Sequence, residues 1–339
     1  MVCYHSRMDL VALTRQLVDI ESISGNEEAV GDFLMTALAA LGFRTEKMHV
    51  SDGRFNVWAC DPGHQSPPVV FSTHMDTVPP FMKSWEDTEN LYGRGACDAK
   101  GIIAAQVGAA LRLRDDGIHV GLLFLVGEER DSQGADVANA HPRGSRFLIN
   151  GEPTENLLGL ASKGALRVNV VAEGRMAHSA YPELGESAIE NLLNALERIR
   201  KIELPVNPHV GPSTMNIGVI EGGRAPNVIP DNARAQLLIR LVGPADGLRR
   251  QITTAAAPDA RTEVVLEIPF VKLRTVPGID TMTASFTTDI PKLSNWGEPL
   301  LIGPGSIHVA HTDREFLAKK ELFRAVELYS QIARELLDN

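Results

Sequence analysis

The chain has 339 residues, 44% of them hydrophobic, and a formal net charge of −10. It is long enough to form two domains, and no block rich in Lys or Arg offsets the acidic balance, which argues against a nucleic-acid or membrane-surface partner. The three scattered cysteines, Cys3, Cys60 and Cys97, form no CxxC pair and are too few for a disulfide framework, so a reducing, cytoplasmic location is expected.

The first residues of the chain show no export or membrane pattern. Charges interrupt the apolar run of residues 1–20, which therefore lacks the continuous apolar core of a signal peptide. No stretch of 18 uninterrupted apolar residues that could cross a bilayer occurs anywhere in the sequence. Either Met1 or Met8 could be the true start.

From the start to about residue 160, helical and strand patterns alternate. Apolar spacing predicts helices at 8–20, 26–41, 100–115 and 133–140. Strands are expected at 43–50, 56–60, 68–73, 120–127 and 146–150. The runs at 69–71 and 122–126 are apolar without interruption, which is typical of central strands covered on both sides. The pattern predicts an α/β domain with helices on both faces of a mostly parallel sheet.

Near residue 163 the pattern changes to alternating apolar and polar residues. It predicts a strand, a helix, two strands, a helix and a strand, at 165–174, 186–202, 214–223, 233–242, 244–256 and 261–268. This order matches the split βαβ, ferredoxin-like sandwich of about 100 residues. After about 272 a strand at 299–303 and a long amphipathic helix over 314–337 follow. We therefore expect a discontinuous domain, 1–162 and 272–339, that holds an inserted α+β domain, 163–271.

Four loops that follow expected strands carry acidic or histidine side chains. Loops at the carboxyl ends of sheet strands converge on a rigid edge, which suits a metal site. Taken alone, each side chain has an ordinary explanation: a lone His is a loop residue, Asp98 could cap the next helix, and a Glu-Glu pair is solvated. Four such loops together favour a metal centre. The residues are His74, Asp76, Asp98, Glu128, Glu129 and Glu152.

The ordered motifs "HMD", "GACDAKG", "GEE", "GEPT" and "AHTDRE" give a specific resemblance. With "GRMAHSAYPELGESAI" and "GGRAPNVIPDNA" in the inserted segment, the chain resembles, over essentially its whole length, a family of di-zinc metallopeptidases and amidohydrolases. That family holds acetylornithine deacetylase, succinyl-diaminopimelate desuccinylase, glutamate-releasing carboxypeptidase and several dipeptidases. The resemblance implies a di-zinc exopeptidase-like catalytic domain with an inserted lid and dimerisation domain, and so a homodimer.

Carried over by motif, the resemblance also implies a set of metal ligands. His74 and Glu152 would bind one Zn²⁺, Glu129 and His311 the other, and Asp98 would bridge them. Co²⁺ or Mn²⁺ could also occupy such a mixed carboxylate and imidazole site.

The remaining catalytic roles follow from the same resemblance. Asp76 would accept the second ring N–H of His74. Glu128 would be the general base for a metal-bridging hydroxide. His178 would reach the partner subunit's site and stabilise the oxyanion. Asn227 and Arg240 would bind the substrate carboxylate and carbonyl region, although Arg240 could instead form a structural salt bridge.

The substrate is less narrowly defined. The run "GPGSIHVAH" resembles acetylornithine deacetylase and favours a small N-acyl amino acid, with Gly303 and Gly305 allowing close backbone approach. "TTDIPKLSNWGEPLLIGPG" and "GACDAKG" also resemble hydrolases that release lysine or ornithine from a carrier protein, and succinyl-diaminopimelate or a dipeptide ranks third.

Two other kinds of protein fit less well. A catalytically silent binding protein of the same fold is disfavoured because Glu128 and every ligand are present. A di-zinc aminopeptidase of related fold would lack the inserted sandwich and its His178 motif.

Overall fold

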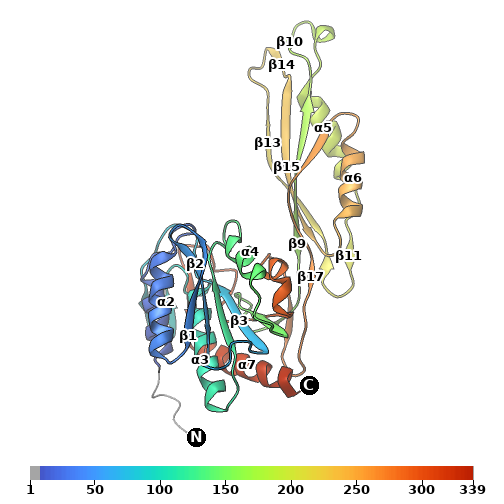
Figure 1. Ribbon diagram of the computed structural model, residues 1–339. Helices are drawn as coiled ribbons and strands as arrows, with labels where there is room; N and C mark the ends of the chain where they lie inside the picture. Colours follow the sequence, from blue (N-terminus) through green and yellow to red (C-terminus); the bar gives the residue numbers. More distant parts are fainter. Residues whose placement is uncertain (1–7, 339) are drawn as a thin grey trace. The chain divides into compact units, whose positions relative to one another are not determined.

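The computed structural model describes residues 8–338 and divides the chain into two compact units (Figure 1). The larger unit comprises Met1–Leu160, Leu273–Met282 and Thr288–Asn339; the inserted unit comprises Ala161–Lys272 and Thr283–Thr287. The sequence pattern placed the inserted segment at 163–271 and did not foresee that 283–287 returns to it. Cys3 and a start at Met1 lie outside the described residues.

The larger unit is built on a six-stranded sheet with the order β1-β2-β6-β3-β7-β19. β6, β3, β7 and β19 are parallel neighbours, whereas β2 runs antiparallel to both β1 and β6. All residues of β3, β6 and β7 are buried, as their apolar runs predict. In chain order the strands are Arg44–Ser51 (β1), Arg54–Cys60 (β2), Val69–His74 (β3), Gly121–Leu125 (β6), Phe147–Asn150 (β7) and Glu298–Leu301 (β19).

Side chains that alternate along these strands pack into two separate cores. Phe71, Leu122 and Ile149 belong to the core that includes residues of α1, α2, α3 and α7. Val70 and Leu123 face the other core, with Ala135 and Ala138 of α4 and the fully buried Trp296. The expected sheet with helices on both faces is therefore confirmed. The helices are Leu10–Val18 (α1), Glu28–Ala40 (α2), Lys100–Asp115 (α3), Gln133–Ala140 (α4) and Lys319–Asp338 (α7).

The C-terminal helix begins later than its amphipathic pattern predicts. Phe316–Ala318 forms a short strand, β20, which pairs antiparallel with Asn90–Tyr92, β5. Together with Trp85–Glu86, β4, these strands make a small sheet of order β20-β5-β4. Backbone pairing with a segment more than 200 residues away prevails over local helix propensity at this point.

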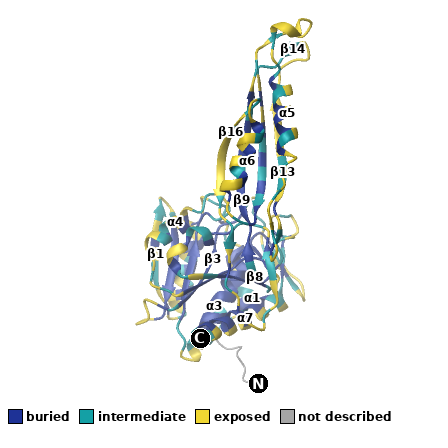
Figure 2. Ribbon diagram, turned by 90° about the vertical axis from the view of Figure 1, so that its right-hand side faces the viewer, coloured by how far each residue is buried: buried dark blue, intermediate teal, exposed yellow. Residues whose placement is uncertain are grey.

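The inserted unit has one four-stranded antiparallel sheet, ordered β13-β15-β9-β16, and two helices. Alternate residues of β9 and β15 pack with residues of both helices in a core of the inserted unit's own, while the edge strand β16 is mostly exposed (Figure 2). The elements are Gly164–Glu173 (β9), Ala188–Ile199 (α5), Thr214–Gly222 (β13), Asn232–Leu241 (β15), Asp246–Ala256 (α6) and Arg261–Ile268 (β16). Their order is the one that the split βαβ pattern predicts.

Short strands complete the two units. Ala177–His178 (β10) pairs with Val228–Ile229 (β14), and Val206–Asn207 (β11) with Gly211–Pro212 (β12). Where the chain passes between the units, Leu158–Ser162 (β8), Val271–Lys272 (β17) and Thr281–Ala284 (β18) form a sheet of order β17-β8-β18. None of the helices in residues 8–338 is long and apolar enough to span a membrane.

Candidate metal centre

The Asp98 carboxylate lies between two imidazoles of the larger unit. Its Oδ1 is 3.0 Å from Nε2 of His74, and its Oδ2 is 3.3 Å from Nε2 of His311. Asp98 is 5% exposed and His74 is buried, whereas the His311 side chain is 49% exposed. This is the geometry of a carboxylate that offers one oxygen to each of two neighbouring positions.

Each imidazole also has a second carboxylate beside it. Glu152 Oε2 is 4.0 Å from Nε2 of His74, and Glu129 Oε1 is 2.8 Å from Nε2 of His311. The ligand atoms of His74, Asp98 and Glu129 lie within 4.8 Å of one another. The structure thus brings the five residues expected as ligands close together, and their binding of metal stays a prediction.

The charges of this cluster suit bound cations. Hydrogen bonds to Asp98 and Glu129 raise the pKa of His311 to about 10. Although burial opposes it, hydrogen bonding to Asp76 and Asp98 raises the pKa of His74. A site that favours a proton on each imidazole so strongly also favours divalent cations there.

An unpartnered oxygen supports the same conclusion. Glu152 Oε1 is buried and has no hydrogen-bond partner among the described residues. A buried carboxylate oxygen is rarely left without a partner, and a metal ion would satisfy it. The mixed oxygen and nitrogen donors therefore fit a two-ion centre, and Zn²⁺, Mn²⁺ and Co²⁺ are all compatible with them.

Three of the four site loops are positioned by the central sheet. β3, β6 and β7 are parallel neighbours, so their carboxyl ends share one edge. His74 ends β3, Glu129 follows β6, and Glu152 follows β7.

Contrary to expectation, Asp98 is not positioned by a strand of the central sheet. It follows β5 of the small sheet, not a strand of the central one, and it lies two residues before α3. The capping alternative is wrong, because Ala99 is the N-cap of α3 and no side chain caps this helix.

Asp76 contacts both the ring of His74 and the backbone of residues 128 and 129. The closest acceptor for Nδ1 of His74 is the backbone carbonyl of Asp76, at 3.0 Å, while the carboxylate is 3.5 Å away. The Asp76 carboxylate accepts instead from the Ser24 hydroxyl, at 2.6 Å, and from the backbone N–H of Glu128 and of Glu129, at 3.1 and 3.2 Å. With Nδ1 bound to the carbonyl, Nε2 is free to face the cluster.

The Glu128-Glu129 pair is not a solvated surface pair. The Glu129 side chain is 8% exposed, and Glu128 is half-buried. Burial, together with the charge of Glu152, raises the pKa of Glu128. Glu128 is thus a carboxylate held next to the cluster on the loop that supplies Glu129.

The other predicted site residues belong to the inserted unit. His178 is exposed on β10, and the N–H of the next residue, Ser179, donates to the Asn227 carbonyl at 3.1 Å, so His178 and Asn227 are neighbours. Arg240 is half-buried near the other end of β15, and its side chain makes no hydrogen bond or ion pair within residues 8–338, which argues against the salt-bridge alternative. Eight residues of strand, roughly 26 Å at about 3.3 Å per residue, separate Asn232 from Arg240.

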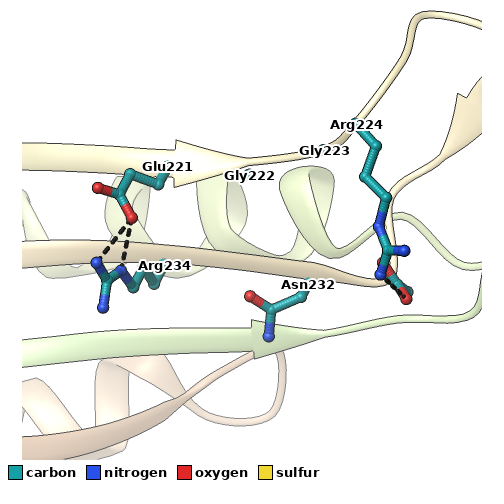
Figure 3. Close-up of a pocket in the computed structure, with 7 residues that line it drawn as sticks. Glu221, Gly222, Gly223, Arg224, Asn232 and Arg234 are labelled. Atoms are coloured by element: carbon teal, nitrogen blue, oxygen red, sulfur yellow. Dashed lines mark hydrogen bonds and ion pairs between the residues drawn. The ribbon is translucent and has the colours of Figure 1, made fainter.

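A polar surface pocket in the inserted unit contains none of these residues (Figure 3). Its arginines are paired within the pocket: Arg224 with Asp231 at 2.9 Å and Arg234 with Glu221 at 2.8 Å. It therefore offers no unpaired charge to a ligand.

Two buried acids beside the cluster received no role from the sequence. Asp289 is 1% exposed, both its carboxylate oxygens lack a hydrogen-bond partner among the described residues, and burial raises its pKa to about 7. Glu315 is also 1% exposed and ends the motif that contains His311. The only sign of Glu315 was its place at the end of the "AHTDRE" motif, and Asp289 lies in no ligand motif.

Comparison with known proteins agrees with this geometry. Residues 160–262 match the model of a peptidase dimerisation domain. A peptidase M20 domain-containing protein of Schizosaccharomyces pombe is 38% identical over 96% of this chain and 84% of its own length. A probable carboxypeptidase of Aspergillus fumigatus is 38% identical over 97% of this chain and 87% of its own length.

Solved structures share the fold at lower identity. A tripeptidase from Staphylococcus aureus has a TM-score of 0.79 at 21% identity and covers 96% of this chain and 98% of its own. A dinuclear metal-binding M20 peptidase from Bacillus subtilis has a TM-score of 0.70 at 16% identity, covering 97% of this chain and 98% of its own. With relatives 38% identical over nearly its whole length, the chain belongs to the M20 peptidase family.

Proposed function

We propose that this M20 hydrolase uses two metal ions, preferably Zn²⁺, to cleave the amide bond that precedes an amino acid with a free α-carboxylate. The observation that carries the proposal is the Asp98 carboxylate, which offers one oxygen beside His74 and the other beside His311. A small N-acyl amino acid of the N-acetylornithine type is such a substrate. A peptide that loses its last residue is another. The carboxypeptidase name of the Aspergillus relative favours the second.

The chemistry is divided between the ions and Glu128. When bound, the ions lower the pKa of a water held between them and polarise the amide carbonyl. Glu128 takes the proton of the attacking water and returns it to the leaving amine. The Asp76 carboxylate fixes this base by holding the backbone N–H groups of Glu128 and Glu129.

The inserted unit supports a homodimer. The region matches a dimerisation domain, and it carries most of the large apolar side chains that are exposed within the described residues. A dimer interface in this unit would cover such side chains. Examples are Met176, Leu193, Val206, Ile220 and Val265.

Two subunits would also explain the separation of the substrate-binding candidates. Because about 26 Å of strand separates the Asn227 end of β15 from Arg240, one small substrate cannot contact both in the same protomer. We assign Arg240 to the substrate carboxylate in one protomer, and His178 and Asn227 to the site of its partner. A half-buried guanidinium without a partner is suited to a carboxylate.

The substrate assignment predicts a dependence on the free carboxylate. Zn²⁺-loaded protein is expected to hydrolyse N-acetylornithine, an N-blocked dipeptide, or both. The C-terminally amidated form of the same dipeptide should lose about 100-fold in kcat/KM, since a buried guanidinium loses a charge-assisted partner. N-acetylcitrulline, N-acetyllysine, succinyl-diaminopimelate and free dipeptides complete the panel. Equal turnover of the acid and its amide contradicts recognition of the carboxylate.

A mixing experiment tests the shared site. His178→Ala should lower kcat by about 10²- to 10³-fold, the usual effect of losing an oxyanion donor, and Glu128→Gln should be nearly inactive. If His178 acts on the partner, subunit exchange between the two variants creates one site with both residues intact. Each heterodimer is therefore expected to regain up to half the activity of a wild-type dimer. No recovery, with heterodimers verified by tag affinity, means that His178 acts within its own protomer or not at all.

A further inference from the structure

Glu315 is placed beside the Asp98 loop by the small sheet. Phe316, the first residue of β20, pairs with Tyr92, the last residue of β5. The Glu315 carbonyl accepts the N–H of Gly93 at 3.2 Å, so the side chain enters the loop formed by residues 93–98. The Glu315 side chain is completely buried there.

The Glu315 carboxylate accepts three backbone N–H groups of this loop and the side chain of Arg94. Oε1 accepts N–H groups from Gly95 at 2.9 Å and from Cys97 and Asp98, both at 3.2 Å. Oε2 accepts from Nη1 of Arg94 at 2.7 Å. One buried side chain thus accepts from four donors within residues 94–98, and one of those donors is the amide of Asp98 itself.

Only a carboxylate satisfies all four donors. Glutamine would present an N–H₂ group either to the guanidinium of Arg94 or to the three backbone N–H groups, and donors that face each other lose their hydrogen bonds. The negative charge is unfavourable so close to Asp98, and the paired Arg94 offsets it. An acid at this position is therefore explained by the loop it holds.

We propose that Glu315 is a positioning residue that sets the Asp98 carboxylate between the two metal positions. The inference rests on the two-ion site proposed above. Asp98 presents one oxygen to each position, so a shift of its backbone displaces a ligand of both ions together. Loss of a residue that orients a ligand typically weakens metal affinity by about 10- to 100-fold.

The test uses Glu315→Gln and the metal-free full-length protein. Co²⁺ is titrated while its visible absorption reports coordination, and bound ions are counted by elemental analysis. Wild-type protein is expected to bind two ions. Glu315→Gln should bind both at least tenfold more weakly and show altered absorption bands.

A matched control separates positioning from general stability. Asp61 is also a buried acid, which accepts from Arg114 at 3.3 Å and contacts His119 at 2.8 Å. It follows β2, which is antiparallel to β6, so it lies at the opposite edge of the sheet from Glu129. Asp61→Asn should lower the melting temperature of the metal-free protein and leave both Co²⁺ affinities unchanged.

A second variant covers a failure of Glu315→Gln to fold. Arg94→Met with Glu315→Leu removes both buried charges together, so that neither is left unpaired, although three backbone N–H groups lose their acceptor. It should fold and still lose affinity for both ions. Wild-type affinity for either ion in a folded Glu315 variant overturns the inference. If wild-type protein itself binds fewer than two ions, the two-ion proposal fails first.

Discussion

Glu128→Gln is expected to lower kcat by about 10²- to 10⁴-fold, the usual contribution of a general base, while two metal ions remain bound. Gln keeps the shape of the side chain but cannot take a proton from the attacking water. The backbone of residue 128 should stay in place, since its N–H is held by the Asp76 carboxylate at 3.1 Å. Steady-state kinetics and elemental analysis of the same sample measure both quantities.

The neighbouring residue provides the control. Glu129→Gln changes a carboxylate on the same loop, but this one lies 2.8 Å from Nε2 of His311. It should lose one ion, and raising the metal concentration should restore part of its activity. Activity of Glu128→Gln that recovers in the same way, or that stays near normal, assigns the base to another residue.

Asp98→Asn is expected to have the largest effect on metal content. It leaves one oxygen on a side chain that offers one to each imidazole, and the new amide group presents a donor where an ion requires an acceptor. Both affinities should fall by about 100-fold or more, and kcat/KM with them at limiting metal. Calorimetric titration of the metal-free protein measures the two affinities.

A variant on one side of the cluster provides the comparison. Glu152 lies 4.0 Å from Nε2 of His74 and forms no ion pair with His311 among the described residues. Glu152→Gln should therefore weaken the binding of a single ion. A loss of one ion in both variants contradicts a bridging role for Asp98. Circular dichroism of each metal-free variant confirms that the fold is retained.

Much of the fold could be predicted because the spacing of apolar residues along the chain indicates its helices and strands. The buried runs of β3, β6 and β7 marked a covered sheet, and three site loops follow from their common direction. The inserted sandwich was equally visible, since β9 and β15 alternate buried and less buried residues.

What could not be predicted depends on pairings far apart in the chain. The late start of α7 and the position of Asp98 both result from β5 binding β20. Asp76 also accepts hydrogen bonds from two backbone amides more than 50 residues away, and the "HMD" motif does not indicate them. Sequence patterns report which residues are present, whereas such contacts depend on the folded backbone.

The glycines near residue 303 show the same limit. A loop beside the substrate was expected there, and that remains a prediction. In the structure a Cβ on Gly303 would lie 2.5 Å from the carbonyl oxygen of Glu152, so this glycine is needed where two loops pack together. The N–H groups of Thr154 and Asn156 both donate to the Gly303 carbonyl, which ties this loop to the one that supplies Glu152.

The pairing of β20 with β5 also sets the order in which the site can be assembled. In chain order, His311 and the segment that docks against the Asp98 loop come after every strand of the central sheet. A growing chain that has already folded its central sheet still lacks a ligand for one ion and the strand beside the bridging carboxylate. The proposed two-ion site can therefore be complete only after residues up to 318 have been made and β20 has paired with β5.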